Sequence, residues 1–165
     1  MNIALVAHDA RKQEMIEWVI YNIDELKKHN IFATGTTGKL VMRAFYEYEL
    51  PRIIAWDDES FQEGVKNYYK DKITCLLSGP LGGDSQIGAM IAEGKIDALI
   101  FFCDNLITQG HQQDVGALSR LASLYNIAFA SNRTTADMIL TSSLFNNNDY
   151  KRVIPVAIDK YKNRM

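Results

Sequence analysis

Short apolar runs alternate along the chain with longer segments in which apolar residues recur every three or four positions. The short runs are rich in β-branched residues and predict five strands, at residues 2–7, 31–34, 73–77, 96–103 and 127–130. The longer segments have the periodicity of helices that bury one face, and they predict helices at 15–29, 39–48, 85–93, 112–125 and 134–140. Because the run at 96–103 is the most apolar, we expect it to be the central strand.

This alternation is typical of a parallel sheet covered by helices on both faces. We therefore expect an α/β fold: a single three-layer domain over residues 1–165, with a five-stranded, mainly parallel, doubly wound sheet. The segment from about 46 to 72 interrupts the pattern, because it holds Pro51, Trp56 and an acidic run at 57–59 but no clear strand or long helix. It is too aromatic for a flexible linker, so we expect an ordered insertion between the second and third strands.

Composition narrows the classes of partner. The chain of 165 residues is 47% hydrophobic, as in an ordinary globular domain. Its formal charge of -2 disfavours a general nucleic-acid binder or a polybasic membrane protein. No apolar run approaches the roughly 20 residues of a membrane helix, and the first residues lack the basic start and long apolar stretch of a signal peptide. We expect a cytoplasmic protein that binds neither nucleic acid nor a membrane.

The cysteines and one histidine suggest no chemistry of their own. Cys75 and Cys103 lie in apolar strand-like segments without C-x-x-C spacing, which predicts buried free thiols rather than a disulfide or a zinc site. The chain also lacks an H-E-x-x-H motif, so we predict no metal site, although His8, His111 and the aspartates are residue types that can bind metals. His29 follows two lysines at a predicted helix end, which indicates a favourable C-terminal charge and no further role.

Polar and glycine-rich segments follow four of the predicted strands, at 8–9, 34–38, 78–84 and 104–114. The carboxyl ends of parallel strands meet at one edge of a doubly wound sheet, where ligands bind. These segments therefore predict a functional site at that edge.

Two of the segments are glycine-rich turns that precede helices. The turn at 34–38, Thr-Gly-Thr-Thr-Gly, offers hydroxyls and unhindered amides where a helix begins, which favours phosphate binding; helix capping explains the same residues. It is not a Walker loop, because only two residues separate Gly35 from Gly38. The turn at 78–84 lacks the G-x-G-x-x-G spacing of a dinucleotide site. Together they indicate a small phosphorylated ligand.

Titratable residues accompany both turns. Asp84 fits a general base beside a phosphate-binding turn, and equally a helix cap. His111 and Asp114 lie within one helical turn of each other, and histidine can donate or accept a proton near neutral pH. Lys12, four residues after His8, can reach a phosphate, although an ordinary surface lysine has the same appearance.

Taken together, these motifs resemble the bacterial methylglyoxal synthase family. The resemblance follows the same order over nearly the whole chain, in the segments 6–9 with Lys12, 33–38, 77–86, 91–97 and 99–102. The combination is specific to the family, whereas the Gly-Thr-Thr-Gly or Gly-Gly-Asp block alone is less so.

The resemblance implies a carbon–oxygen lyase that converts dihydroxyacetone phosphate to methylglyoxal and inorganic phosphate, in a bypass of glycolysis and with no metal or organic cofactor. Asp84 would be the base that removes a C3 proton to form an enediol(ate). His111 would polarise the carbonyl and move protons, supported by Asp114, Asp104 and Asp9. The implied substrate ligands are His8, Lys12, Thr34, Gly35, Thr36, Thr37, Ser78 and Gly79, together with His111. The resemblance further implies a homohexamer and inhibition by phosphate.

The chain departs from the family pattern in two places. The segment of about 46–72 is longer than the family's usual link, and a lid, an oligomer contact, a regulatory surface or simple decoration all fit it. The segment 104–114 lacks the family's prolines, which predicts a more mobile loop around His111. Arg164 aligns with a family arginine linked to anion binding.

Two other functions remain open at this point. A non-catalytic regulatory domain of the same fold, as in carbamoyl phosphate synthetase, would bind a phosphorylated effector without chemistry. Asp84 and His111 favour the enzyme, since a binding module does not need them. A phosphosugar isomerase would use the same residue types but would protect the phosphate ester from elimination.

Overall fold

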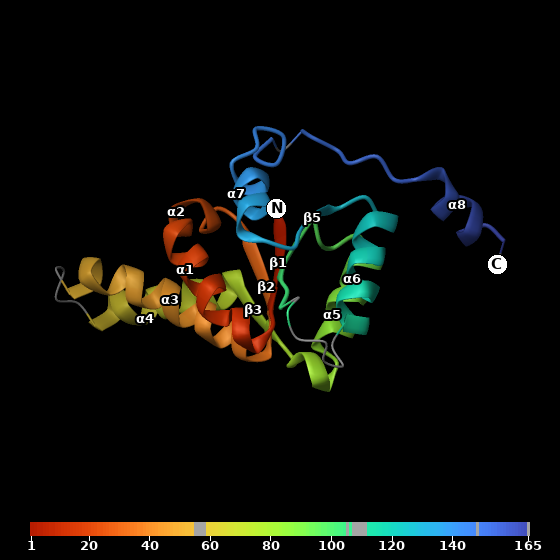
Figure 1. The fold of residues 1–165 in the computed structure, drawn as a ribbon. Helices are drawn as coiled ribbons and strands as arrows, with labels where there is room; N and C mark the ends of the chain where they lie inside the picture. The colour runs from red at the N-terminus through yellow and green to blue at the C-terminus, as the bar shows by residue number, and fades with distance from the viewer. Residues whose placement is uncertain (55–58, 105, 107–111, 148, 165) are drawn as a thin grey trace.

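The computed structural model describes residues 1–54, 59–104, 106, 112–147 and 149–164. Within these ranges the backbone alone is described at 50–54, 59–62, 64–66, 112–114 and 162. The strands are β1 (Asn2–Ala7), β2 (Asn30–Thr34), β3 (Ile73–Leu76), β4 (Ala98–Phe102) and β5 (Ala128–Ala130). They form one sheet in the order β3-β2-β1-β4-β5, and every neighbouring pair is parallel (Figure 1). The predicted five-stranded α/β sheet is confirmed.

The prediction that residues 96–103 form the central strand is wrong. β1 occupies the centre of the sheet, and β4 is its neighbour. Both strands pair with a neighbour on each side, and both are buried on their two faces. A strand with a neighbour on each side is buried whether or not it is the central one, so apolarity alone cannot tell which of the two is central.

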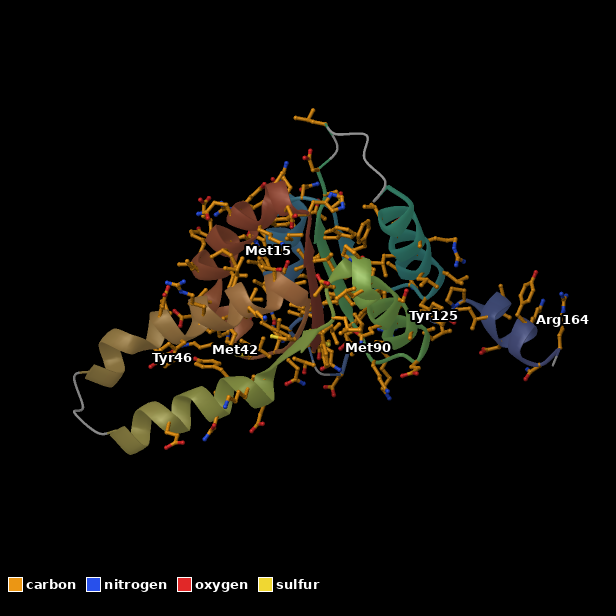
Figure 2. The ribbon with its side chains drawn as sticks, turned by 90° about the horizontal axis from the view of Figure 1, so that it is seen from below. Met15, Met42, Tyr46, Met90, Tyr125 and Arg164 are labelled. Atoms are coloured by element: carbon orange, nitrogen blue, oxygen red, sulfur yellow. The ribbon has the colours of Figure 1, made fainter. Side chains whose placement is uncertain are left out.

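Helices cover both faces of the sheet and make two hydrophobic layers. The helices are α1 (Lys12–Tyr21), α2 (Ile23–Leu26), α3 (Gly35–Ile54), α4 (Glu59–Lys72), α5 (Gly83–Ala92), α6 (Gln112–Leu124), α7 (Arg133–Leu140) and α8 (Val156–Lys162). Alternate β1 residues point to opposite layers: Ile3 and Leu5 pack with α1, α3 and α7, whereas Ala4 and Val6 pack with α5 and α6. Figure 2 shows Met15 and Met42 on one side of the sheet and Met90 on the other.

Within the segment from about 46 to 72, the described residues 46–54 and 59–72 are helical, which corrects the prediction that it holds no long helix. α3 continues through Ile54, and α4 begins at Glu59, so that the two helices lie side by side and project away from the sheet (Figures 1 and 2). Two contacts fix the base of this helical hairpin: the rings of Phe45 and Tyr69 pack edge to face with centroids 5.2 Å apart, and the Tyr69 hydroxyl donates to Glu49 Oε1 at 3.2 Å. Tertiary packing of this kind outweighs the weak local signal around Pro51.

Two predictions about single residues are also wrong. Cys75 is exposed because β3 is an edge strand, although Cys103 is buried as predicted. His29 is buried against the ring of Phe145, with centroids 5.4 Å apart. Burial, and after it the nearby terminal ammonium group, lowers the pKa of His29 to about 4, so this side chain is neutral rather than a helix-capping charge. The packing of residue 145 onto residue 29 is a long-range contact that a local pattern does not reveal.

The C-terminal strap, residues 149–155, crosses the amino edge of the sheet before α8. Arg152 Nη1 donates to the carbonyl of Ile96 at 2.8 Å and lies 3.3 Å from Asp97 Oδ1. Asn126 Nδ2 donates to the carbonyl of Val153 at 2.9 Å. These contacts lead α8 to the far side of the molecule from α1 and α3 (Figure 1). Among the described residues, none of the helices has the length and apolarity needed to cross a bilayer.

Candidate functional site

The carboxyl ends of four parallel strands meet at one edge of the sheet, as the strand-end pattern predicts. The β1 and β4 ends are joined where His8 N–H donates to the carbonyl of Phe102 at 3.2 Å. The β2 and β3 ends are joined where Gly35 N–H donates to the carbonyl of Leu77 at 3.0 Å. A Cβ at Gly35 would come within 2.6 Å of Ser78 Cα, so only glycine permits this approach. The two glycine-rich turns therefore touch each other.

His8 is held in a defined orientation after β1. Its Nδ1 accepts the N–H of Asp104 at 2.9 Å, and its ring packs edge-on to Phe101 with centroids 5.1 Å apart. A nitrogen that accepts carries no proton, so the proton of the neutral ring lies on Nε2. His8 is thus arranged to present a ring N–H donor.

Lys12 begins α1, one short 3-10 turn (Asp9–Arg11) after His8. Its Nζ lies 2.5 Å from Asp9 Oδ1, and the Asp9 side chain is 95% exposed. An ion pair with so exposed a carboxylate is weak. Lys12 therefore remains able to turn towards an anionic ligand, while Asp9 faces solvent.

The Thr-Gly-Thr-Thr-Gly segment is the end of β2 and the first turn of α3, four residues earlier than the predicted helix start. Thr34 and Thr37 are buried, and Thr36 is exposed. The first amides of a helix have no intrahelical acceptor, and they point along the axis where the dipole is positive. In this 20-residue helix those amides lie at the edge where the strands converge. The geometry suits an anion.

Asp84 lies within the first turn of α5 and is half-buried. The N-cap of α5 is Gly82, and no side chain caps the helix, so the alternative that Asp84 is the N-cap is wrong. Its carboxylate lies against Gly79: a Cβ added at Gly79 would come within 2.7 Å of Asp84 Oδ2. The carboxylate is therefore in contact with the backbone of the glycine-rich turn itself.

The structure does not place every predicted site residue. His111 lies outside the described residues, and Asp114 belongs to α6 with only its backbone described. Asp104 is half-buried, and its Oδ1 accepts the N–H of Leu106 at 3.0 Å. Arg164 follows α8, where its guanidinium lies 5.0 Å from the centroid of the Tyr161 ring, away from the carboxyl edge of its own sheet (Figures 1 and 2). The edge thus unites predicted site residues from four segments of the chain: His8, Lys12, Thr34, Gly35, Thr36, Thr37, Ser78, Gly79, Asp84 and Asp104.

One residue with a structural role at this edge has no predicted function. Gln86 Oε1 accepts the N–H of Leu77 at 2.9 Å and so joins α5 to the chain that leaves β3. In the sequence Gln86 is visible only as part of a segment that resembles the family. A hydrogen bond between residues nine positions apart leaves no periodic pattern in the sequence from which it could be predicted.

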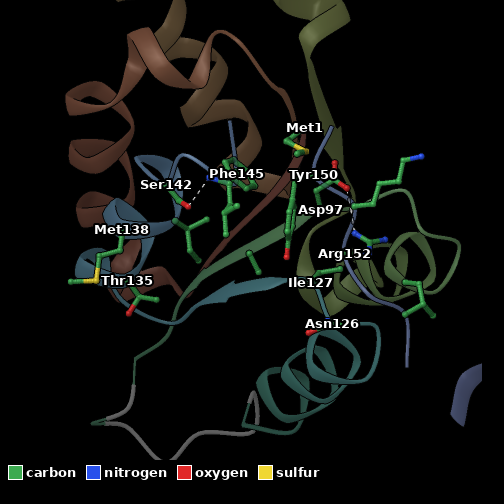
Figure 3. A pocket seen from close by; sticks show the side chains of 15 residues that line it. Met1, Asp97, Asn126, Ile127, Thr135, Met138, Ser142, Phe145, Tyr150 and Arg152 are labelled. Atoms are coloured by element: carbon green, nitrogen blue, oxygen red, sulfur yellow. Dashed lines mark hydrogen bonds and ion pairs between the residues drawn. The ribbon is translucent and has the colours of Figure 1, made fainter. Parts of the chain in front are cut away.

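A cavity of about 720 Å³ lies at the opposite, amino edge of the sheet (Figure 3). Met1, Asp97 and Ala128, at or next to the starts of three strands, form part of its wall. Met138 of α7 and Tyr150 of the C-terminal strap also line it. This cavity is therefore separate from the carboxyl edge. Among the described residues, no group of three or more His, Cys, Asp or Glu side chains is arranged to hold a metal ion.

Comparison with known proteins identifies the family to which the chain is similar. The family model described as "MGS-like domain" matches residues 62–131. The methylglyoxal synthase of Pseudoalteromonas atlantica is 47% identical over 153 residues, which cover 93% of this chain and 96% of that protein. The chain belongs to the methylglyoxal synthase family.

Two further members of the methylglyoxal synthase family extend the comparison. The protein of Maridesulfovibrio salexigens is 49% identical over 144 residues, which cover 87% of this chain and 85% of that protein. The crystal structure of methylglyoxal synthase from Elizabethkingia anophelis matches with a TM-score of 0.69 and 38% identity, over 93% of this chain and 92% of that one. The resemblance seen in the motifs is confirmed, and the fold is that of the methylglyoxal synthase family.

Proposed function

We propose that this protein is a methylglyoxal synthase, a lyase that converts dihydroxyacetone phosphate to methylglyoxal and inorganic phosphate. The observation that carries the proposal is the contact of the Asp84 carboxylate with Gly79, which puts a base directly beside a turn suited to phosphate. The relatives that cover most of the chain bear the same enzyme name. A regulatory module needs the turn but not the carboxylate, so the enzyme is favoured over the binding domain.

The phosphate of the substrate binds where the first amides of α3, the turn at Ser78–Gly79 and Lys12 converge. Helix amides and the lysine ammonium supply positive potential without any large net charge on the protein. The hydroxyls of Thr34, Thr36 and Thr37 complete the proposed set of ligands. The near-zero net charge of the chain is compatible with such a local anion site.

Asp84 then acts as the general base. It removes a proton from C3 of dihydroxyacetone phosphate, and the electron pair of that C–H bond forms the enediolate across C3, C2 and its oxygen. A base must lie within about 3 Å of the carbon it deprotonates, and donors must face the oxygen on which charge develops. We assign the donor roles to the ring N–H of His8 and to His111. Asp9, Asp104 and Asp114 support them.

Phosphate leaves in the second step. The enediol C3 hydroxyl loses its proton as the C3–O double bond forms, the electron pair of C2–C3 moves to C1–C2, and the C1–O bond to phosphate breaks. The phosphate departs with that bonding pair. The remaining enol, whose C2 oxygen took up a proton at the enediolate stage, gains a proton at C1 and loses the C2 hydroxyl proton as the C2 carbonyl forms, which gives methylglyoxal. The same amides and Lys12 that bind the phosphate stabilise it as it leaves. His111 moves the protons between the oxygens.

The decisive assay gives purified protein dihydroxyacetone phosphate and measures methylglyoxal and inorganic phosphate together. Equal amounts of both products are expected. Formation of glyceraldehyde 3-phosphate alone would instead identify an isomerase, and binding without turnover would identify a regulatory module.

Asp84→Asn tests the base. The amide cannot accept the proton, so kcat should fall by at least about 10³-fold while phosphate still binds. The exposed Asp71 of α4 supplies the control, Asp71→Asn, which should keep wild-type kcat. Substantial turnover by Asp84→Asn would reject the assignment. For His111→Gln, full activity would likewise remove the proton-shuttle role.

The resemblance supports further proposals about assembly, regulation and role. We infer a homohexamer, inhibition by inorganic phosphate, and a role in a bypass of glycolysis in the cytoplasm. We also infer that residues 1–165 form one domain in which the helical hairpin of α3 and α4 includes an insertion of about residues 46–72. Light scattering of the purified protein measures the oligomer, and initial rates at rising phosphate concentration measure the inhibition.

A further inference from the structure

We propose that Gln86 is a positioning residue that holds the base Asp84 in register with the phosphate-binding turn. The inference rests on the proposed function, because it assumes that Asp84 is the base. It concerns a residue that touches neither the reacting carbon nor the phosphate. The juxtaposition behind it is the hydrogen bond from Leu77 N–H to Gln86 Oε1, at 2.9 Å, which joins the first turn of α5 to the residue directly before Ser78.

Leu77 is the point at which three elements meet. Its carbonyl accepts the N–H of Gly35 at the start of α3, and its N–H donates to Gln86 on α5. Because Leu77 directly follows β3, its N–H and its carbonyl connect the end of that strand to two different helices by hydrogen bonds. The position of the Ser78–Gly79 peptide therefore depends on both hydrogen bonds.

Asp84 and Gln86 share the first turn of α5, two residues apart. Asp84 contacts Gly79, and Gln86 binds Leu77, so the helix meets the turn on both sides of Ser78. The backbone adds a third link, from Gly83 N–H to the carbonyl of Ser78 at 3.0 Å. Among these links only the one made by Gln86 uses a side chain that can be changed without altering the backbone or the base.

The chemistry makes this link relevant to turnover. The substrate phosphate is bound by the turn, and its C3 proton must come within reach of Asp84 on the helix. A displacement of about 1 Å between the two can lower a rate by roughly 100-fold. Loss of the Gln86 bond frees the Leu77 peptide and permits such a displacement.

The accepting atom decides the design of the variants. Gln86→Met preserves length and removes the acceptor, whereas Gln86→Glu keeps an oxygen acceptor for the Leu77 N–H. The matched control is Gln13→Met, at an exposed glutamine of α1 whose amide donates to Glu17 at 3.1 Å. The three variants are assayed with dihydroxyacetone phosphate, and thermal unfolding of each is recorded.

The expected result is a kcat for Gln86→Met about 10- to 100-fold below wild type, with KM changed less than about threefold and a melting temperature within a few degrees. Gln86→Glu should recover kcat to within about threefold, even if its charge raises KM for the anionic substrate. Gln13→Met should behave as wild type.

Three outcomes would overturn the proposal: wild-type kcat in Gln86→Met, an equal loss of kcat in both Gln86 variants, or a change in KM alone. Each outcome is read in an experiment where the wild type produces methylglyoxal and Asp84→Asn does not. Failure of the positioning role is therefore distinguishable from failure of the proposed function, in which the wild type itself gives no methylglyoxal.

Discussion

At the scale of single residues, the site depends on side chains that are missing as much as on those present. Gly79 contributes no functional group, yet the absence of a Cβ is what lets the Asp84 carboxylate lie against the turn. Gly35 likewise permits the start of α3 to reach Ser78. A residue of this kind affects the site through the space that it leaves open.

Gly79→Ala should therefore impair catalysis more than folding. The added methyl group would displace the Asp84 carboxylate, so we expect kcat to fall by about 10- to 100-fold. Gly116→Ala in α6 is the control, because a Cβ there meets nothing within 4 Å. It should leave kcat unchanged and raise the free energy of unfolding by up to about 1 kcal/mol. Equal kcat values for the two variants would show that Gly79 does not set the position of the base.

His29 makes stability depend on pH. Its pKa is about 4 in the folded protein, against an ordinary value of 6.5, so between these values the unfolded chain binds more protons. The contribution of neutral His29 is therefore complete above pH 6.5 and is lost as the pH falls towards 4. The full difference is about 3 kcal/mol.

The measurement is urea unfolding of the wild type and of His29→Leu at several pH values from 7.5 to 4. The difference between the two proteins removes the effect of groups that they share. We expect this difference to shift by about 3 kcal/mol in favour of the variant as the pH falls. A difference that stays constant with pH would contradict the assignment of a neutral, buried His29.

At the scale of elements, contacts far apart in the sequence decide what local patterns leave open. The segment of about 46–72 contains a proline and many aromatic residues, and its periodicity predicts no long helix. In the folded protein Lys27, which directly follows α2, has its Nζ 2.9 Å from Glu49 Oε1 of α3. The hydroxyl of Tyr69 on α4 donates to the same carboxylate. The ion pair joins α3 to the end of α2, and the Phe45–Tyr69 contact joins α3 to α4. Packing thus stabilises the two helices where propensity does not.

Arg152 provides the side-chain contacts that the C-terminal strap itself makes with the start of β4, beside the bond from Asn126 to Val153. Arg152 donates to the Ile96 carbonyl and pairs with Asp97, and its side chain is only 18% exposed. Arg152→Ala should lower the free energy of unfolding by about 2 kcal/mol and increase proteolysis within residues 149–155. Lys151→Ala, at an exposed neighbour, should change it by less than about 0.5 kcal/mol. If the two alanine variants were equally stable, the strap would not depend on this contact.

At the scale of the whole molecule, the site exists because parallel strands end at a common edge. Four strands deliver to that edge residues separated by nearly a hundred positions, from His8 to Asp104. The segment 78–84 holds the base and one part of the proposed anion site, and the segments at 8–12 and 34–37 supply the other part. Folding assembles the two, so ligand binding and folding are linked.

Inorganic phosphate should consequently stabilise the folded protein. At a concentration 100 times its Kd the expected gain is about 2.7 kcal/mol, measurable as a rise in melting temperature. Lys12→Met should reduce this rise. Lys95→Met is the control, because Lys95 pairs with Glu93 just before β4, at the opposite edge of the sheet. An identical response of wild type and Lys12→Met would exclude Lys12 from the phosphate site.

The sequence by itself determined the α/β class, the five strands and the family, and it predicted the candidate site at the strand ends, because these follow from periodicity and from short motifs that are local along the chain. Only the tertiary structure decided that β1 is central, that residues 46–54 and 59–72 are helical, that Cys75 is exposed and that His29 is buried. It also revealed the link between Gln86 and Leu77 and the contact of Asp84 with Gly79. Each of these depends on which distant segments pack together, and that choice is made by the burial of the whole chain rather than by any segment alone.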